Sequence, residues 1–274
     1  MSALDVLADW PVPQAAAAVL TPGGVQATHG DVDAAFRLAS VTKPIVARAA
    51  QVAVEEGAVD LGTPAGPPGS TVRHLLAHTS GLGMLDDTVL APPGTRRIYS
   101  NTGFAVLARA IEEAAGIEFG DYLTEAVLAP LGMAATTLDG GAAAAGYGAT
   151  STVADLARFA ADLLVPTVVS APMHAEAISV QFPGLDGVLP GYGRQRPNDW
   201  GLGFELRDGK SPHWTGVNNS ARTFGHFGQA GTFIWVDPAA ELALVVLTSR
   251  DFGDWAHPLW PAISDGVLRE FGAH

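Results

Sequence analysis

The sequence predicts an α/β protein of the α+β type, with an antiparallel β-sheet flanked by N- and C-terminal helices and an inserted all-helical lobe. Two observations favour this class: strand-like patterns lie near both ends of the 274-residue chain, and helical patterns dominate residues 71–164. Because strands from both ends must share one sheet, we expect a single domain of two lobes. The expected α/β lobe comprises residues 1–60 and 201–274, and the mainly helical lobe comprises 61–200.

The first part of the chain is expected to form a hairpin, a long helix and a loop. β-prone runs at 15–21 and 25–28 are separated by a Pro-Gly-Gly sequence that is typical of a turn. A helix is expected from about 41 to 56, and Pro44 fits its first turn because that amide has no partner within the helix. Residues 62–70 are rich in Pro and Gly and predict a loop.

Helical patterns dominate the middle of the chain and strand-like patterns return at its end. The helical patterns lie at 72–78, 102–115, 119–128 and 153–164. Residues 166–200 are rich in Pro and Gly and lack clear periodicity, so we expect a long surface excursion there. Strand-like patterns follow at 201–206, 231–237 and 242–248. An amphipathic helix at 255–271 is expected to close the fold.

Composition supplies a packed core and disfavours some partners. Hydrophobic residues make up 48% of the chain and charged residues 16%. The formal net charge of −13 disfavours binding to nucleic acid or to an anionic membrane surface. The chain has no cysteine, which excludes disulfides and thiolate metal ligands. Neither a signal peptide nor a membrane span is recognisable in the sequence, so we expect a cytoplasmic protein.

Ser40 and Lys43 form a Ser-x-x-Lys pattern near the start of the first expected helix. Residues three apart project from the same helix face, so the Lys43 amine can approach the Ser40 hydroxyl. Lys210 is the only other lysine, and most cations of the chain are arginines. An arginine stays charged, whereas a desolvated lysine can lose its proton and act as a base. Ser40 is therefore a candidate nucleophile with Lys43 as a built-in base.

Two further motifs carry chemistry-bearing side chains. Tyr99 and Asn101 precede a predicted helix and point the same way in an extended segment. The alternative is a core tyrosine followed by a helix cap. His226 and Gly228 share one face of a predicted strand, where glycine lets a substrate approach closely; the alternative is a Gly-rich turn before a hairpin. A backbone N–H in this strand, opposite that of Ser40, would complete a two-donor oxyanion hole.

Together these motifs resemble those of the serine β-lactamase and penicillin-binding-protein superfamily, closest to its class C β-lactamase-like branch of esterases and D-peptidases. Ser40-x-x-Lys43, Tyr99-x-Asn101 and His226-x-Gly228 match the three motifs of that superfamily in order. Residues 72–82 look like its "HLLTHTSGL" segment, and shorter landmarks are matched at 92–95, 129–133 and 151–159. The resemblance covers roughly residues 14–272 and implies a β-lactamase/transpeptidase-like fold.

The resemblance implies that Ser40 attacks a carbonyl carbon to form an acyl-enzyme, which water then hydrolyses. Tyr99 would relay the proton to the leaving group, and whether Lys43 or Tyr99 is the general base stays open. Asn101 would orient the acyl side chain. The backbone N–H groups of Ser40 and Gln229 would be the oxyanion donors. The substrate would bind along His226, Gly228 and Gln229.

Phe227 is the main departure from the family pattern. Members that act on penicillins or D-alanyl peptides usually carry Thr or Ser there, whose hydroxyl helps to hold the substrate carboxylate. A phenyl ring offers no donor and adds apolar surface. His226 in place of lysine also supplies less positive charge at neutral pH. We therefore expect small esters or amides of uncharged acids as substrates, in a cleft bordered by shorter loops than in relatives.

Several alternatives are weighed against this esterase or amidase. A true β-lactamase, a D-Ala-D-Ala carboxypeptidase and a non-catalytic binding module on the same fold all stay open. A metal hydrolase is disfavoured because His74 and His78 lack the intervening Glu and a third ligand, so neither a metal nor another cofactor is expected. The expected partner is a small-molecule ester, amide or lactam, and the oligomeric state stays open. His213 is expected to be exposed, and Trp200 is expected either to line the cleft or to fill the core.

Overall fold

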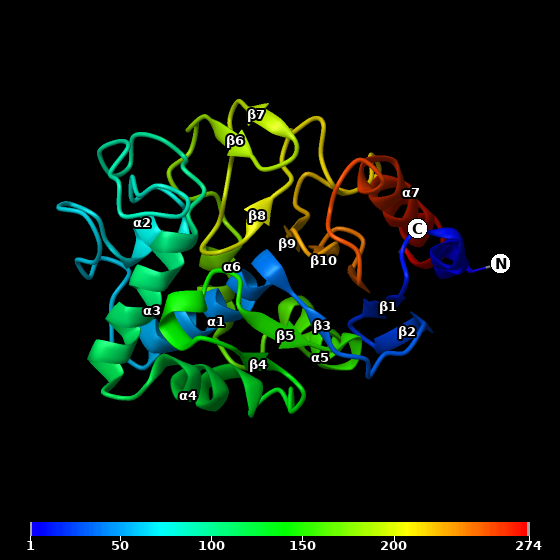
Figure 1. Ribbon diagram of the computed structural model, residues 1–274, viewed down its shortest axis with the longest axis horizontal. Helices are drawn as coiled ribbons and strands as arrows, with labels where there is room; N and C mark the ends of the chain where they lie inside the picture. The colour runs from blue at the N-terminus through cyan, green and yellow to red at the C-terminus, as the bar shows by residue number, and fades with distance from the viewer. Residues whose placement is uncertain (1, 273–274) are drawn as a thin grey trace.

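A six-stranded antiparallel sheet forms the centre of the computed structural model, which describes residues 2–272 (Figure 1). In spatial order its strands are β2 (Gly24–His29), β1 (Ala15–Thr21), β11 (Leu242–Thr248), β10 (Thr232–Asp237), β9 (Phe224–Gly228) and β8 (Glu205–Leu206). β1 pairs with β11, so the two ends of the chain complete one sheet. The antiparallel sheet predicted from the sequence is therefore confirmed.

Both faces of the sheet are buried, and its central strands show why. In β1, Ala16, Ala18 and Leu20 enter one hydrophobic core. Ala17 and Val19 point the other way and enter a second core. β11 is divided in the same manner, which explains why both strands are continuous apolar runs. The sheet therefore needs a layer of helices on each face.

Helices from the two ends of the chain cover one face. The 3₁₀ helix η1 (Ala3–Asp9) and the closing helix α7 (Ala256–Phe271) pack against each other, η1 also against β1 and α7 against β11, at the right of Figure 1. On the other face, α5 (Val153–Leu164) packs against β1, β10 and β11. We expected α5 within the helical lobe at 61–200, but its apolar stripe is buried against the sheet. The expected division into lobes at residues 60 and 200 therefore does not follow the packing of this helix.

The remaining helices gather around α1 (Thr42–Glu55), which is buried from Thr42 to Ala53. The helices that pack on α1 are α3 (Asn101–Ala115), α4 (Phe119–Leu123), η3 (Thr124–Leu128) and α6 (Ala171–Ala177), and α2 (Val72–Leu76) packs on α3. A short helix, η2 (Ala39–Val41), leads into α1 and packs against β9 and β10. The N-terminal end of α1 therefore lies where the sheet meets the helices.

Two small sheets and a further turn of helix complete the fold. The first sheet has the order β3 (Phe36–Arg37), β5 (Ala149–Ser151), β4 (Thr137–Leu138), and the second consists of β6 (Gly187–Leu189) and β7 (Gly193–Gln195); the helical turn is η4 (Gly141–Ala144). None of the five short strands was expected from the sequence. Each has two or three residues, which is too short for an alternating pattern to be recognised.

The segment 166–200 is not the surface excursion that its composition predicted. It contains α6 and the β6–β7 hairpin, and Gln181, Asn198 and Trp200 are buried. The buried Arg97 guanidinium donates to the backbone carbonyls of Gln181 at 2.7 Å and Asn198 at 2.9 Å. Because polar contacts of this kind hold the segment in place, its sequence shows no apolar periodicity.

The segment around His226 also differs from the prediction. We expected it to open the strand at 231–237, and it forms a separate strand, β9, which pairs with β10 through a tight turn. The expected strand at 201–206 is reduced to Glu205–Leu206. The predicted helices at 41–56, 102–115 and 153–164 agree closely with α1, α3 and α5.

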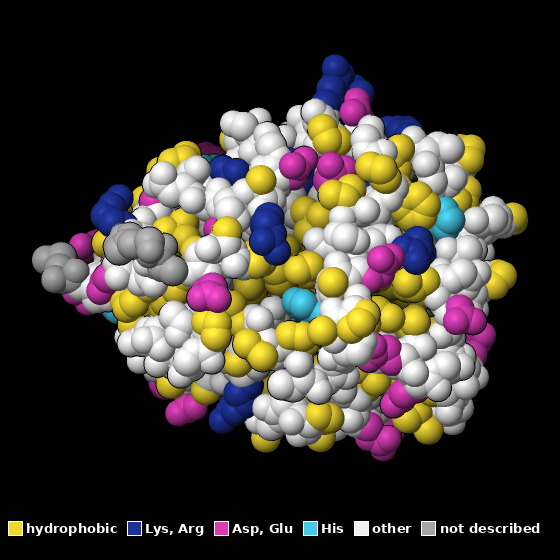
Figure 2. All heavy atoms as spheres, turned by 180° about the vertical axis from the view of Figure 1, so that it is seen from behind, with side chains coloured by type: hydrophobic (Ala, Val, Ile, Leu, Met, Phe, Trp, Pro, Cys, Tyr) yellow, Lys and Arg dark blue, Asp and Glu magenta, His cyan; other side chains and the backbone are white. Residues whose placement is uncertain are grey.

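Charge is dispersed over the surface that Figure 2 shows. Acidic and basic side chains on this face stand singly or in small groups, with hydrophobic and neutral ones between them. Among residues 2–272, no helix has the length and apolarity needed to cross a bilayer.

Candidate active site

Ser40 lies in η2, just before α1, at the boundary between sheet and helices. The preceding residue, Ala39, has a φ of 46°, in the left-handed region that residues other than glycine rarely adopt. Strain of this kind costs on the order of 1–3 kcal/mol and is concentrated at functional sites. Ser40 is partly exposed, whereas Lys43, one turn further along, is fully buried.

The Lys43 amine contacts Ser40 and two carbonyl oxygens. Its Nζ lies 3.3 Å from Ser40 Oγ and donates to Asn101 Oδ1 at 2.6 Å and to the Gly146 carbonyl at 2.8 Å. Burial lowers the pKa of Lys43 well below its usual 10.5, with no carboxylate beside it to oppose the shift. A neutral amine has two N–H donors, which the two carbonyl oxygens accept, and one lone pair. That lone pair is left for the proton of Ser40.

Tyr99 contacts the same serine from the other side. Its hydroxyl donates to Ser40 Oγ at 2.7 Å, and its ring lies 4.5 Å from Lys43 Nζ. Burial raises the pKa of Tyr99 above its usual 10.0, and the hydrogen bond to Ser40 opposes this only in part. The side chain is therefore a phenol, which can donate a proton, rather than a phenolate.

The neighbours of Tyr99 hold its segment in place. The Ser100 hydroxyl caps α3 by accepting from the Gly103 N–H at 2.8 Å and donates to the Gly83 carbonyl at 2.6 Å. The Ser100 N–H donates to His78 Nδ1 at 3.1 Å. The helix cap that we considered at Asn101 is thus supplied by Ser100, and the Asn101 amide oxygen is free to accept from Lys43.

β9 approaches the nucleophile closely because residue 228 is glycine. A Cβ at Gly228 would lie 2.2 Å from the Leu38 carbonyl oxygen and 3.2 Å from the backbone N of Ser40. Thr232 Oγ1 also donates to the Leu38 carbonyl, at 2.8 Å. Within residues 2–272, the backbone N–H groups of Ser40 and Gln229 donate no hydrogen bond. Both are therefore available to an oxyanion, and their role as its donors stays a prediction.

His226 is buried beside Tyr99 and carries no charge. Its Nδ1 lies 2.6 Å from the Phe227 carbonyl, which can only accept, so Nδ1 holds the proton and Nε2 the lone pair. Burial, followed by the nearby Lys43, lowers the pKa of His226 to about 3. His226 thus offers no cation to a substrate.

A pocket opens between these elements. It is lined by Ser40, Met84, Tyr99, Leu189, Pro190, Trp200, Glu205, His226, Phe227 and Gln229. Trp200 lines the pocket and is also buried in the second core, so both alternatives that the sequence left open apply to it. Phe227 is only 7% exposed, because its ring also packs against Tyr192 and Phe252 in the second core.

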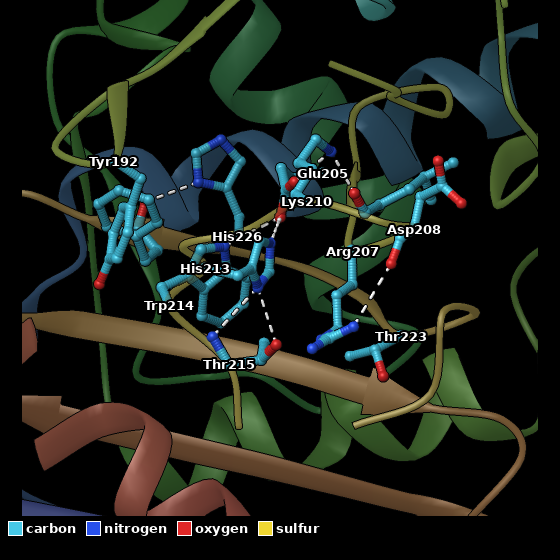
Figure 3. A network of polar contacts seen from close by, with 12 residues as sticks. Tyr192, Glu205, Arg207, Asp208, Lys210, His213, Trp214, Thr215, Thr223 and His226 are labelled. Carbon is cyan, nitrogen blue, oxygen red and sulfur yellow. Dashed lines mark hydrogen bonds and ion pairs between the residues drawn. The ribbon is translucent and has the colours of Figure 1, made fainter. Parts of the chain in front are cut away.

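A buried ion pair forms part of the pocket wall. Figure 3 shows the Glu205 carboxylate between Lys210 and His213: Oε1 accepts from the Lys210 amine, and Oε2 lies 2.8 Å from His213 Nε2 and accepts from Trp214 Nε1 at 2.9 Å. Burial alone would raise the pKa of Glu205, but the nearby His213 and Lys210 lower it to about 2. His213 is buried here and not exposed, as the sequence had led us to expect.

The predicted site residues come together around Ser40. Lys43, Tyr99, His226, Gly228 and Gln229 all surround the serine. Asn101 Oδ1 accepts from Lys43, and the role of its amide in orienting the acyl side chain stays a prediction.

Gly146, Trp200 and Glu205 also belong to the site; the sequence analysis did not select Gly146 or Glu205 and left the place of Trp200 open. The pattern Gly146-Tyr147-Gly148 is a local signal that another group approaches the backbone closely, and it could have drawn attention to Gly146. Trp200 and Glu205 carry no local signal, since only packing brings them to the pocket.

The two histidines weighed as metal ligands have other partners. His74 Nδ1 lies 2.9 Å from Thr71 Oγ1, and His78 Nδ1 accepts from the Ser100 N–H. Among the residues that the structure describes, no group of three His, Cys, Asp or Glu side chains is placed to hold a metal ion.

Comparison with known proteins identifies the family of the chain. A family model described as Beta-lactamase matches residues 8–266. A solved β-lactamase from Mycobacterium bovis is 74% identical, with a TM-score of 0.99 over 99% of this chain and 100% of the other. EstCE1, a hydrolase with promiscuous acyltransferase activity, has a TM-score of 0.79 over 97% of this chain and 96% of its own, but at 18% identity it shows the fold alone.

A curated relative matches in part. Penicillin-binding protein 4* of Bacillus subtilis is 33% identical over 36% of this chain, and the match spans 29% of that protein's length. The family model, in contrast, extends over nearly all of the chain and includes every predicted motif residue. The chain therefore belongs to the β-lactamase family.

Proposed function

We propose that this protein is a serine hydrolase that cleaves small esters or amides through an acyl-enzyme on Ser40. One observation carries the proposal: Ser40 Oγ lies within reach of a neutral amine on one side, at 3.3 Å, and of a phenol on the other, at 2.7 Å. A base to accept the serine proton and an acid to protonate a leaving group are thus both in place.

The proposed acylation moves one proton from the serine to the leaving group. Lys43 accepts the Ser40 proton while Oγ attacks the carbonyl carbon, and the oxyanion binds to the N–H groups of Ser40 and Gln229. Collapse of the tetrahedral intermediate breaks the bond to the leaving group, which takes the Tyr99 proton. The proton held by Lys43 then restores the Tyr99 phenol.

The proposed deacylation runs the same steps with water as the nucleophile. Lys43, again neutral, accepts a proton from water, and the hydroxide adds to the acyl carbon. Ser40 leaves and is protonated, and the acid product departs. The assignment of Lys43 as the base is supported by the directions of the two pKa shifts, since burial favours the neutral form of both Lys43 and Tyr99.

The preference for esters or amides without charge beside the scissile bond rests on the pocket wall. His226 is neutral, Phe227 offers no donor, and the Lys210 ammonium is bound to Glu205. A carboxylate beside the scissile bond would find no cation there. β-Lactam hydrolysis is the second candidate, because the relative from Mycobacterium bovis that is 74% identical is described as a β-lactamase.

The proposal is tested with acylating probes and intact-mass measurement. A fluorophosphonate should add to the wild type and leave Ser40→Ala unmodified. A panel of p-nitrophenyl esters, D-amino-acid amides and a chromogenic cephalosporin then ranks the candidate reactions. Faster turnover of the cephalosporin than of every ester and amide would favour the β-lactamase. Absence of an adduct with several probes would contradict the enzyme and favour a binding module.

A further inference from the structure

A second cleft adjoins the Ser40 pocket. Met84, Tyr99 and Pro190 line both, so the two spaces share a wall. The segments that form the second cleft, 95–99 and 186–190, run side by side, and the Arg97 N–H donates to the Asp186 carbonyl at 3.2 Å. A substrate chain that extends past Tyr99 from the pocket therefore enters this cleft.

Apolar side chains in the second cleft are exposed to solvent. Met84 is 46% exposed, Leu90 55% and Val188 59%. Exposed apolar side chains gathered at the mouth of a pocket are typical of a binding surface. Contact with a hydrocarbon chain would remove this surface from water.

The same cleft gathers positive charge in a protein whose net charge is −13. Its lining contains Arg96, Arg97 and Arg194, against a single acidic residue, Asp186. Arg194 pairs with Asp186 at 3.1 Å, and Asp186 also lies 3.3 Å from Arg196. The Asp186 carboxylate is therefore shared by the guanidinium groups of Arg194 and Arg196. A further positive charge, on Arg96, has no ion-pair partner among residues 2–272.

Arg97 belongs to the lining of the cleft, and its charge is buried behind that wall. Its guanidinium is buried and donates to the backbone carbonyls of Ala77 at 2.5 Å and of Phe182 at 3.1 Å, besides those of Gln181 and Asn198. These carbonyls satisfy its N–H groups without neutralising its charge, and Asp199 is the acidic group that acts on it. Positive charge thus stands in the second cleft and is missing beside the nucleophile.

From this arrangement we propose that the second cleft binds the distal part of the substrate: an apolar chain that ends in an anionic group, such as a carboxylate. This inference rests on the proposed hydrolysis at Ser40 and specifies its substrate class. The scissile bond lies in the Ser40 pocket, which offers no free cation, the chain crosses Met84 and Val188, and the anion meets Arg96 and Arg194. An exposed pair of this kind is worth roughly a two- to five-fold effect.

The test uses pairs of substrates that differ only in the distal charge. Mono-p-nitrophenyl suberate carries a free carboxylate, and its methyl ester has the same length and leaving group. A second pair places the carboxylate on the alcohol side: 6-acetoxyhexanoate and its methyl ester. The ratio of kcat/KM within each pair is measured for the wild type, Arg96→Gln, Arg194→Gln and the matched control Arg109→Gln on the exposed face of α3.

We expect the wild type to prefer the charged substrate in one pair, and each cleft variant to reduce that preference roughly two- to five-fold. Arg109→Gln should leave it unchanged, and added salt should weaken it. Turnover without any preference, or an equal loss in Arg109→Gln, would overturn the inference while the proposed hydrolase stands. Absence of both turnover and a Ser40 adduct would overturn the two together.

Discussion

The two lysines of this chain are both buried, yet their surroundings differ in one respect. Lys43 is bound by carbonyl oxygens and a serine hydroxyl, and burial lowers its pKa. Lys210 is bound by the Glu205 carboxylate and by the carbonyls of Asp199 and Leu206. A neighbouring carboxylate stabilises an ammonium ion, whereas carbonyl dipoles alone leave a buried amine easier to deprotonate.

Lysine therefore has two different roles in this site. The amine without a carboxylate partner keeps a lone pair for proton transfer to and from Ser40. The amine with a partner holds Glu205, and through it the β8 edge of the pocket. The presence of the Glu205 carboxylate beside Lys210, and its absence beside Lys43, thus separates a structural lysine from the proposed catalytic one. The predictions below test this separation.

The largest expected effect is on activity at Lys43. Lys43→Met removes the base and should lower kcat at least about 10³-fold, because positioned acid–base groups contribute about 10²–10⁴-fold. Lys43→Arg should be equally inactive, since a guanidinium does not deprotonate. The measurement is steady-state hydrolysis of a p-nitrophenyl ester, with thermal unfolding to confirm that both variants are folded. Activity of Lys43→Arg within ten-fold of the wild type would remove Lys43 as the base.

The next effect is on stability at Lys210. Lys210→Met leaves the Glu205 carboxylate buried beside His213 without its ammonium partner and should destabilise the protein by about 3–5 kcal/mol. Lys43→Met strands no charge and should destabilise the protein less, by the loss of the donor to the Asn101 and Gly146 oxygens only. Urea unfolding of the two variants measures the difference. Glu205→Gln combined with Lys210→Met should recover part of the loss, and equal stability of both single variants would contradict the comparison.

Stability should also rise with pH at both sites, but over two separate pH ranges. The pKa of Glu205 is about 2 in the folded protein against 4.5 ordinarily, so its contribution of about 3 kcal/mol is present above pH 4.5 and is lost as pH falls toward 2. The pKa of Lys43 is lowered, so the unfolded chain binds the extra proton and stability rises with pH up to about 10.5.

Urea unfolding across this pH range separates the two contributions. Glu205→Gln should flatten the acid limb, and Lys43→Met should flatten the alkaline rise. Each variant serves as the control for the other, because each leaves the opposite limb unchanged. An acid limb that persists in Glu205→Gln would assign the loss to other carboxylates.

The same contrast shows what the sequence could and could not predict. Ser40 and Lys43 were predictable because their spacing on a helix is local, and Tyr99 and His226 followed from motifs in a fixed order. The Lys210–Glu205 pair was not predicted, although both residues are close in sequence, because nothing local shows that a loop lysine is buried. The partner of Lys43 at Gly146 lies 103 residues away and depends on how η4 packs against α3.

The elements of the fold likewise divide into those that a local sequence pattern predicted and those that it did not. Elements with an apolar period, such as α1, α5 and the β10–β11 hairpin, were predicted close to their observed bounds. The segment 166–200 was misjudged because Arg97 and Gln181 hold it through side-chain contacts to backbone groups, which produce no period. β9 was missed as a separate strand because all five of its residues are buried and two are glycine, so it shows no alternation.

The smallest expected effect concerns Phe227, which lines the pocket together with Ser40 and Glu205. Phe227→Thr supplies a hydroxyl where a carboxylate beside the scissile bond could bind and should raise penicillin-type turnover relative to ester turnover by a few-fold, since one hydrogen bond to a charged group is worth about 1 kcal/mol or more. Because the ring packs against Tyr192 and Phe252, the variant loses stability as well. Phe227→Leu is the matched control, which loses the ring without gaining a donor. The ratio of kcat/KM for a cephalosporin and a p-nitrophenyl ester should rise only in the threonine variant, and an equal rise in both would show that space, and not the hydroxyl, limits the lactam.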